Sequence, residues 1–221
     1  SHAMGNSSGD LEDYHEMFFS SPRFVGGCIW EWCDHALPQG KTEDGRIKYG
    51  YGGDFGERHN DGNFCMDGLV YPDRTPHTGL LEAKQVYRPV RVSRQDGRFI
   101  LTSCLAFEDA GKLLDCRYEI CDLNGVISEG MLEFSVQPMG STELTIDGTA
   151  NNTFINFYFT AKSDTLWCEK GYHVCFEQVM LTEIKSAQSA DSGEEPVLTE
   201  TPLSFVVKMG DVTYTIDRRR G

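Results

Sequence analysis

Residues 90–107 read VRVSRQDGRFILTSCLAF, which is two runs of alternating apolar residues joined by the turn signal QDG. The alternation continues to about residue 184 through DCRYEICDL, GVISEGMLEF, STELTI, TFINFYFTAK and HVCFEQVML, with turn signals between the runs. Because side chains alternate between the two faces of a strand, this pattern predicts about seven strands in about 95 residues. Short, regularly spaced strands are typical of an immunoglobulin- or fibronectin-like β-sandwich, which we place at residues 89–185.

The composition changes after the predicted sandwich. Residues 186–202 are rich in Ser, Glu and Pro, which predicts a linker. The last stretch, LSFVVKMGDVTYTIDRRRG at 203–221, predicts two strands and a turn. Two strands are too few for a stable sheet, so we expect residues 203–221 to be the first strands of a further, C-terminal β domain.

The residues before the sandwich predict an α/β architecture. Residues 9–20 carry the i, i+3, i+7 apolar spacing of an amphipathic helix, which Asp10 could cap. Residues 24–32, FVGGCIWEW, form an apolar run short enough for a fully buried strand, and residues 79–87 predict a second helix. A helix, a short turn and a buried strand are the repeating elements of a parallel α/β unit, which we place at 1–88.

Residues 33–79 are rich in Gly, Asp, Asn and Pro and show little periodicity. A loop of this length inside a compact domain is usually functional or disordered. Interleaved aromatic residues such as Tyr49, Phe55 and Phe64 favour an ordered loop. We therefore look for function in this loop first.

The composition of the chain limits the kinds of partner that it can bind. The 221 residues carry a net charge of −14, which disfavours nucleic acid and anionic membrane surfaces as partners. No apolar run reaches the ~18–20 residues that span a bilayer, and no secretion signal is visible. The eight cysteines form no C-x-x-C pair and show no zinc spacing, so we expect reduced thiols, partly in the core, and a cytoplasmic location. A disulfide framework is the alternative.

Three stretches together resemble one family. HAMGNS (2–7), GGCIWEWCDH (26–35) and YGGDFGERHNDGNFCMDGLVYPDRTPH (51–77) are similar to the end of the catalytic barrel in β-galactosidases of glycoside hydrolase family 2. LAFEDAGKLLDCRYEI and LWCEKGYHVCFEQVML resemble the sandwich that follows in that family. The resemblance implies a multi-domain α/β plus all-β protein, in which the C-terminal part of a (β/α)8 barrel precedes the sandwich.

The resemblance also implies retaining hydrolysis of terminal β-D-galactosides such as lactose by two Glu residues. In the family the nucleophile lies three residues before the His of HAMGNS, and the acid/base lies further upstream. We therefore expect this chain to contain neither catalytic Glu, to be a fragment cut at both ends, and to be inactive alone. The full-length enzyme is expected to be a homo-oligomer.

The resemblance assigns a substrate-binding role to three residues. His2 would hydrogen-bond galactose hydroxyls, and Trp30 would stack on the apolar side of the sugar. Asp67 and the Phe64 carbonyl would bind a monovalent cation, Na⁺ or K⁺, that touches the galactose 6-hydroxyl. Well-known members carry Asn where this chain has Asp67, which leaves the identity of the cation open.

Other residues have weaker assignments. Asn60 falls in the loop that in the family approaches a Mg²⁺ ion, whose main ligands lie upstream. Asp34 lies behind the sugar site or braces the loop, and Trp32 is expected to pack. The loop-bracing residues are expected to be Asp54, Asp73, Arg74 and His77. Two aromatic residues of the sandwich, Trp167 and Tyr172, are expected in the core or in a domain contact.

Two alternatives remain open from the sequence. The parent could be a family relative with another glycone, such as a β-glucuronidase, although the NFCMDG loop favours galactose. The chain could instead be a β-sandwich with a binding or assembly role and no catalysis. The gene sequence upstream of Ser1 separates these cases, because only an enzyme requires a barrel with two Glu residues there.

Overall fold

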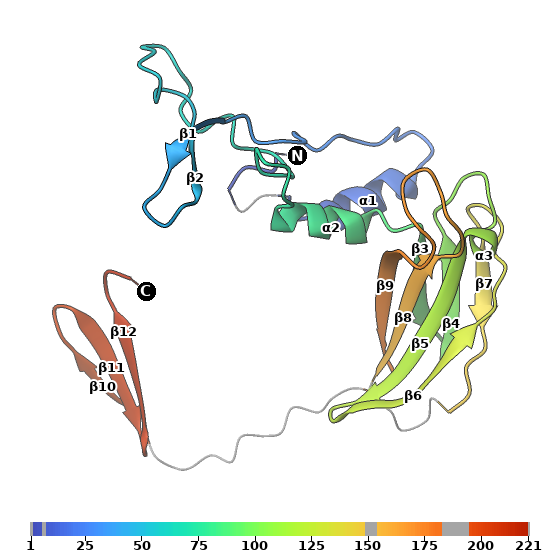
Figure 1. Cartoon of the computed structure of the whole chain (residues 1–221). Coiled ribbons are helices and arrows are strands. Elements are labelled where there is room, and N and C mark those ends of the chain that lie inside the picture. The colour runs from blue at the N-terminus through green and yellow to red at the C-terminus, as the bar shows by residue number, and fades with distance from the viewer. Residues whose placement is uncertain (1, 6–7, 149–153, 183–194, 221) are drawn as a thin grey trace. The chain divides into compact units, whose positions relative to one another are not determined.

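The computed structural model describes residues 2–5, 8–148, 154–182 and 195–220 (Figure 1). The chain divides into two compact units, Ser1–Glu183 and Ile184–Gly221. Within the described ranges, no helix has the length and apolar character needed to cross a membrane.

The larger unit contains a two-sheet sandwich in which every strand pairing is antiparallel. The three-stranded sheet has the order β3-β4-β7 and the four-stranded sheet the order β6-β5-β8-β9 (Figure 1). The described residues of this range contain seven strands, which confirms the prediction of about seven. The strands are β3 (Val90–Gln95), β4 (Arg98–Ser103), β5 (Leu114–Asp122), β6 (Gly125–Leu132), β7 (Ser141–Leu144), β8 (Phe154–Ala161) and β9 (His173–Met180), and a short helix, α3 (Ala110–Leu113), precedes β5.

Alternation of side chains builds the sandwich core. Along β8 every second residue is buried, and Phe157 and Phe159 are fully inaccessible. Phe157 meets Phe99 of the opposite sheet edge-to-face, with ring centroids 5.8 Å apart. Burial raises the pKa of the Cys116 and Cys175 thiols to about 12, so both are neutral apolar core residues, as predicted.

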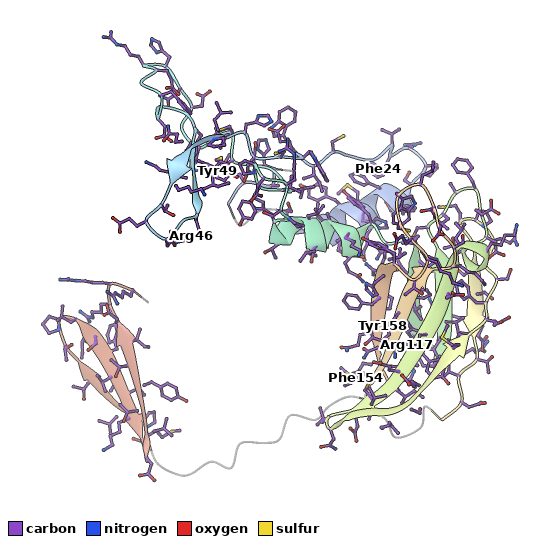
Figure 2. All side chains as sticks on the ribbon, viewed as in Figure 1. Phe24, Arg46, Tyr49, Arg117, Phe154 and Tyr158 are labelled. Carbon is purple, nitrogen blue, oxygen red and sulfur yellow. The ribbon has the colours of Figure 1, made fainter. Side chains whose placement is uncertain are left out.

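The outer face of the four-stranded sheet carries paired charges. Arg117 of β5 lies beside Tyr158 of β8 (Figure 2), with its guanidinium carbon 4.7 Å from the ring centroid. The Tyr158 hydroxyl donates to Glu119 over 3.0 Å. Charged pairs thus lie on this face beside exposed apolar residues such as Phe176 and Met180, whereas the inner face is apolar throughout.

Two helices lie before the sandwich, α1 (Leu11–Ser20) and α2 (Thr78–Val86), as the sequence predicts. They pack through a small core of Leu11, Ala83 and Val86. The expected cap is wrong, because Asp10 adopts a left-handed conformation and its side chain makes no capping hydrogen bond.

The loop 33–79 is more structured than its composition predicts. It contains a hairpin of β1 (Leu37–Lys41) and β2 (Ile47–Gly50), whose turn is closed by the Thr42 amide donating to the Arg46 carbonyl over 2.8 Å. The turn residues of KTEDGR therefore indicate a hairpin. The sequence analysis missed it because the flanking residues show no period-two alternation.

The predicted buried strand at 24–32 is wrong for this structure. The segment forms no strand, and Val25 and Trp30 are exposed. In the described part of the chain, only its last residues pair with distant backbone: Trp30 bridges to His2, and Glu31 hydrogen-bonds to Asp67 and Leu69. A fully buried strand needs hydrogen-bonded neighbours on both sides and covered faces, and an apolar run cannot supply these by itself.

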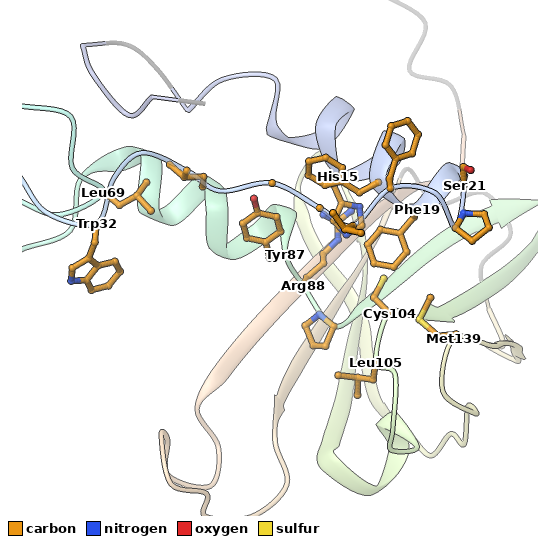
Figure 3. Close-up of a pocket in the computed structure, with 18 residues that line it drawn as sticks. His15, Phe19, Ser21, Trp32, Leu69, Tyr87, Arg88, Cys104, Leu105 and Met139 are labelled. Carbon is orange, nitrogen blue, oxygen red and sulfur yellow. The ribbon is translucent and has the colours of Figure 1, made fainter. Parts of the chain in front are cut away.

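An apolar hollow of about 1000 Å³ lies between α1, the segment 24–29 and one end of the sandwich (Figure 3). Phe19 of α1 lines one side, and Leu105 and Met139 of the sandwich line another. Trp32 also lines the hollow and is 61% exposed, so the prediction that Trp32 packs is wrong for this chain.

A charged joint connects the helices to the sandwich. Glu12 of α1 pairs with Arg91 of β3 and, over 3.4 Å, with Arg88, which in turn pairs with Glu177 of β9. Burial raises the pKa of Glu177 despite Arg88. Burial also acts to raise the pKa of Glu12, but Arg91 and Arg88 outweigh it and hold that pKa low. Beside them, burial and then Arg91 lower the pKa of His15.

The sandwich also touches α2 through aromatic residues. Lys84 of α2 donates to the Tyr172 hydroxyl over 3.2 Å and lies 4.6 Å from the centre of that ring. Trp167 meets Tyr172 edge-to-face at 5.6 Å. The expected domain contact is therefore confirmed for Tyr172, whereas Trp167 remains 68% exposed.

The smaller unit is a three-stranded antiparallel sheet with the order β10-β11-β12. Its strands are β10 (Val197–Glu200), β11 (Ser204–Met209) and β12 (Val212–Asp217). The two strands expected at 203–221 are confirmed, but β10 falls within the predicted linker 186–202, which is wrong there. The VLTE stretch of β10 pairs with β11 from Val197 opposite Lys208 onward. Residues 186–194 of that linker lie outside the described ranges.

Candidate functional site

The three motifs that resemble family 2 β-galactosidases meet around Trp30. The Ala3 amide donates to the Trp30 carbonyl over 2.7 Å, and the Glu31 amide donates to the Asp67 carbonyl over 2.7 Å. The Leu69 amide closes the second pairing by donating to the Glu31 carbonyl over 2.9 Å. Residues far apart in sequence are thus held side by side by backbone hydrogen bonds.

Asp67 is the most unusual group at this meeting point. Its side chain is fully buried, and neither carboxylate oxygen makes a hydrogen bond. The imidazole of His2 lies beside it, with Nδ1 3.5 Å from Asp67 Oδ2. An ionised carboxylate in such a place costs several kcal/mol unless a cation or a hydrogen-bond donor compensates it. The donor chemistry of Asp67 therefore fits a cation.

His2, Phe64 and Trp30 surround this carboxylate in different ways. The rings of His2 and Phe64 meet edge-to-face with centroids 6.1 Å apart. Trp30 bridges to His2 through the backbone, and its side chain is 58% exposed, so Trp30 is not a core residue here. The structure therefore brings together His2, Trp30 and Asp67, the three predicted substrate-binding residues, with Phe64 beside them.

Asn60 is engaged within its own loop. Its Oδ1 accepts from the Gly62 amide over 3.0 Å, and its Nδ2 donates to the Glu57 carbonyl over 3.3 Å. In the described ranges no group of three or more His, Cys, Asp or Glu side chains could hold a metal ion. The role of Asn60 near magnesium stays a prediction.

Asp34 braces the loop that carries Asp67. One of its oxygens accepts from the Gly68 amide over 2.8 Å, and the other lies 2.9 Å from His77 Nε2. His77 in turn stacks on Tyr71 at 3.6 Å between ring centroids. Asp34 is buried, and its two partners, Gly68 and His77, lie 34 and 43 positions further along the sequence. It therefore fixes the backbone next to Asp67.

The other predicted braces also make local hydrogen bonds. Asp54 accepts from the Tyr51 amide over 2.9 Å, and Asp73 accepts from the Thr75 hydroxyl over 2.7 Å. Arg74 donates to the Pro72 carbonyl over 3.1 Å. The bracing role predicted for Asp54, Asp73, Arg74 and His77 is confirmed.

Two further loop residues were missed by the sequence analysis. Glu57 accepts from the Gly53 and Phe55 amides, and these hydrogen bonds lower the pKa of the carboxyl group. Cys33 is buried and receives a hydrogen bond from Arg74. Glu57 could have been found from its place in a Gly-rich turn, whereas the Cys33 contact has no local signal.

Two family models match this chain. Residues 1–92 match the family model of the glycosyl hydrolases family 2 TIM barrel domain, and residues 99–182 match that of β-galactosidase domain 4. The chain belongs to glycoside hydrolase family 2. The family resemblance that the sequence motifs indicated is thus confirmed.

Curated relatives of this family 2 chain are β-galactosidases. That of Actinobacillus pleuropneumoniae is 39% identical over 227 residues, which is 100% of this chain and 22% of the relative. That of Staphylococcus xylosus is 34% identical over 98% of this chain and 22% of the relative. That of Klebsiella pneumoniae (strain 342) is 33% identical over 100% of this chain and 22% of the relative. The chain spans about a fifth of the length of these relatives.

Proposed function

We propose that this chain is a segment of a retaining β-galactosidase and supplies part of the galactose-binding surface. In this proposal His2 hydrogen-bonds sugar hydroxyls and Trp30 offers its indole face to the apolar side of the ring. Both catalytic Glu residues belong to other parts of the enzyme, so the chain alone does not hydrolyse lactose or other galactosides.

The observation that carries the proposal is the environment of Asp67. A buried carboxylate without a hydrogen-bond partner is rare in folded proteins, because its desolvation is costly. It is found mainly where an ion, a ligand or a functional role offsets that cost. A cation held by Asp67 and the Phe64 carbonyl would supply it, and hard monovalent or divalent ions prefer such oxygen ligands. Na⁺ or K⁺ at this place, and Mg²⁺ near Asn60 with ligands from elsewhere, belong to the same proposal.

A second function, a binding or assembly module without catalysis, would need no such site. The outer face of the four-stranded sheet carries paired charges, such as Arg117 with Glu119 and Glu129, among scattered exposed apolar side chains, which gives no specific support for a binding role. A β-glucuronidase would need positive charge for the substrate carboxylate, and the buried Asp67 next to His2 is unsuited to that. Oligomerisation and a cytoplasmic location of the whole enzyme remain part of the proposal.

A chimera tests the proposal. Residues 1–221 replace the matching segment of the Actinobacillus pleuropneumoniae β-galactosidase, and hydrolysis of nitrophenyl galactoside and nitrophenyl glucuronide is measured. We expect galactoside hydrolysis only, and no turnover by the isolated chain. In the chimera, Trp30→Ala should lower kcat/KM by about 10- to 100-fold, corresponding to ~1–3 kcal/mol of transition-state binding.

Trp167→Ala is the matched control, because Trp167 is also an exposed tryptophan but lies on the sandwich. It should leave kcat/KM unchanged. A chimera that folds with a native thermal midpoint yet hydrolyses no galactoside would refute the proposed role. So would turnover by the isolated chain in proportion to its concentration, once residual host enzyme is excluded.

A further inference from the structure

His15 of α1 contacts the sandwich through a hydrogen bond that requires a neutral imidazole. The residue is 7% exposed, and its Nδ1 lies 3.1 Å from Nη2 of Arg91 on β3. A guanidinium group has donors only, so Nδ1 accepts and the ring proton of the neutral imidazole is on Nε2. Neither the family assignment nor the proposed galactose surface gives His15 a role.

Arg91 cannot easily turn away from His15, because other groups hold its guanidinium. Nη2 also donates to the Val86 carbonyl at the end of α2 over 2.8 Å. Nη1 donates to the Glu12 carboxylate, one helical turn before His15. The same guanidinium group therefore connects α1, α2 and β3 at one point, and His15 lies against it.

The charges around His15 are already balanced without a charge on its ring. Arg88 pairs with Glu12 and with Glu177 of β9, so two arginines face two glutamates. His15 and Arg88 line the same hollow (Figure 3). A proton on His15 would add an uncompensated positive charge. The titratable and charged groups that face His15 or belong to this network are Glu12 and Glu16 of α1, Tyr87 and Arg88 after α2, Arg91 of β3, Cys104 after β4 and Glu177 of β9.

Protonation would act against the contact in two ways. Nδ1 would become a donor facing a donor, and a positive charge would lie 3.1 Å from the Arg91 guanidinium. Glu12 and the ring of Phe19, stacked on His15 at 4.5 Å between centroids, attract a cation. Burial first and then Arg91 outweigh Glu12, so the pKa of His15 is lowered from 6.5. The folded state therefore holds this proton more weakly than the unfolded chain, and the contact stabilises the joint above about pH 6.5 and is lost as the pH falls through the lowered pKa.

We propose that His15 is a proton-sensitive contact whose protonation in mild acid releases α1 from the sandwich. The helix has ten residues, Leu11–Ser20, and isolated helices shorter than about 12–15 residues are only marginally stable in water. Once released, α1 unfolds locally while the sandwich stays folded. The proposal does not depend on the galactose surface, because none of its argument uses His2, Trp30 or Asp67.

NMR spectroscopy of the 221-residue chain between pH 7 and pH 5 tests the proposal. The His15 ring resonances should titrate with a midpoint below 6.5. Protection of the amides of residues 14–20 against hydrogen exchange, corrected for the intrinsic rate, should fall at least about threefold from pH 7 to pH 5, while that of Phe157 and Phe159 on β8 stays constant. A midpoint at or above 6.5, or equal protection of α1 at the two pH values, would overturn the proposal.

Two variants remove the proton and keep part of the contact. His15→Asn offers Arg91 an amide oxygen near the position of Nδ1, and His15→Phe keeps the stacking on Phe19 and decides the matter if the asparagine variant is unstable. In either variant the protection of α1 should be the same at pH 7 and pH 5. Acid sensitivity that survives in the variants would assign it to another group and overturn the proposal.

His173→Asn is the matched control. Burial also lowers the pKa of His173, and its carbonyl accepts from Lys84 of α2 over 2.7 Å, so His173 is a second histidine at the contact between the helices and the sandwich. This variant should keep the full loss of α1 protection in acid. Loss of the acid sensitivity in His173→Asn would show that His173, and not His15, controls the release.

Discussion

The sandwich and the segment 24–77 both contain many apolar and aromatic residues, but they bury them very differently. In the sandwich, Phe99, Phe157 and Phe159 are almost inaccessible. In the segment 24–77, large side chains such as Trp30 and Phe64 stay more than half exposed. The sandwich strands find their hydrogen-bonding neighbours within about 95 residues, whereas the segment 24–32 meets distant backbone at its last residues, through Trp30 with His2 and Glu31 with Asp67 and Leu69. An apolar run therefore indicates only that burying the segment would be favourable. Period-two alternation over many strands also indicates which neighbouring strands bury it.

The largest change in stability that tests this comparison is expected in the sandwich core. Phe157→Ala should lower the free energy of unfolding by about 3–5 kcal/mol, because Phe157 is fully buried and packs on Phe99. Urea unfolding followed by far-UV circular dichroism measures this change. Phe176→Ala is the control, since Phe176 of β9 is 45% exposed and should cost under ~1 kcal/mol. Equal losses in the two variants would contradict the two-sheet core.

The same contrast explains what the sequence could predict. Strand positions in the sandwich and the helices α1 and α2 followed from local periodicity, because each of these elements is stabilised by faces that repeat along the chain. The site was predictable only through the family resemblance of HAMGNS and NFCMDG. The contact of Asp34 with His77 spans 43 residues and leaves no periodic trace.

A smaller effect is expected at the charged joint between the two regions. The pKa of Glu12 is held below its ordinary value of 4.5, since Arg91 and Arg88 outweigh the opposing effect of burial. A carboxyl group whose pKa is lower in the folded state stabilises the fold above the unfolded pKa, and this contribution is lost as the pH falls through the folded pKa. Glu12 is partly exposed, so solvent limits the contribution to below ~1 kcal/mol.

Glu12→Gln should therefore be less stable than wild type at pH 7, and the difference should shrink once the pH falls below 4.5 and vanish as it passes through the lowered pKa of the folded carboxyl group. Urea midpoints across this pH range measure it. Glu16→Gln, one turn further along α1, is the control, because Glu16 makes no ion pair with the described part of the chain. A difference that grows as the pH falls would show that the pairs of Glu12 with Arg88 and Arg91 do not stabilise the joint.

The smallest effect is expected for Trp30, and it tests the other side of the comparison. A tryptophan that packs in a core costs about 3–5 kcal/mol when it is truncated to alanine. Trp30 is 58% exposed, so Trp30→Ala in this chain should change stability by less than ~0.5 kcal/mol. A global unfolding curve reports mostly on the sandwich, so the measurement must be local.

Amide hydrogen exchange provides that local measurement. The amides of Ala3, Glu31 and Leu69 donate to the carbonyls of Trp30, Asp67 and Glu31, so their protection reports directly on the backbone that meets at Trp30. We expect the three protection factors in Trp30→Ala to stay within about threefold of wild type, since 0.6 kcal/mol corresponds to roughly this ratio. If protection at Glu31 and Leu69 collapses while the sandwich amides are unchanged, the indole is a packing residue of the segment 24–77, and a loss of kcat/KM in the chimera could no longer be assigned to stacking on galactose. If protection is retained, the exposed indole is free to serve the substrate, and any kinetic loss in the chimera belongs to the sugar.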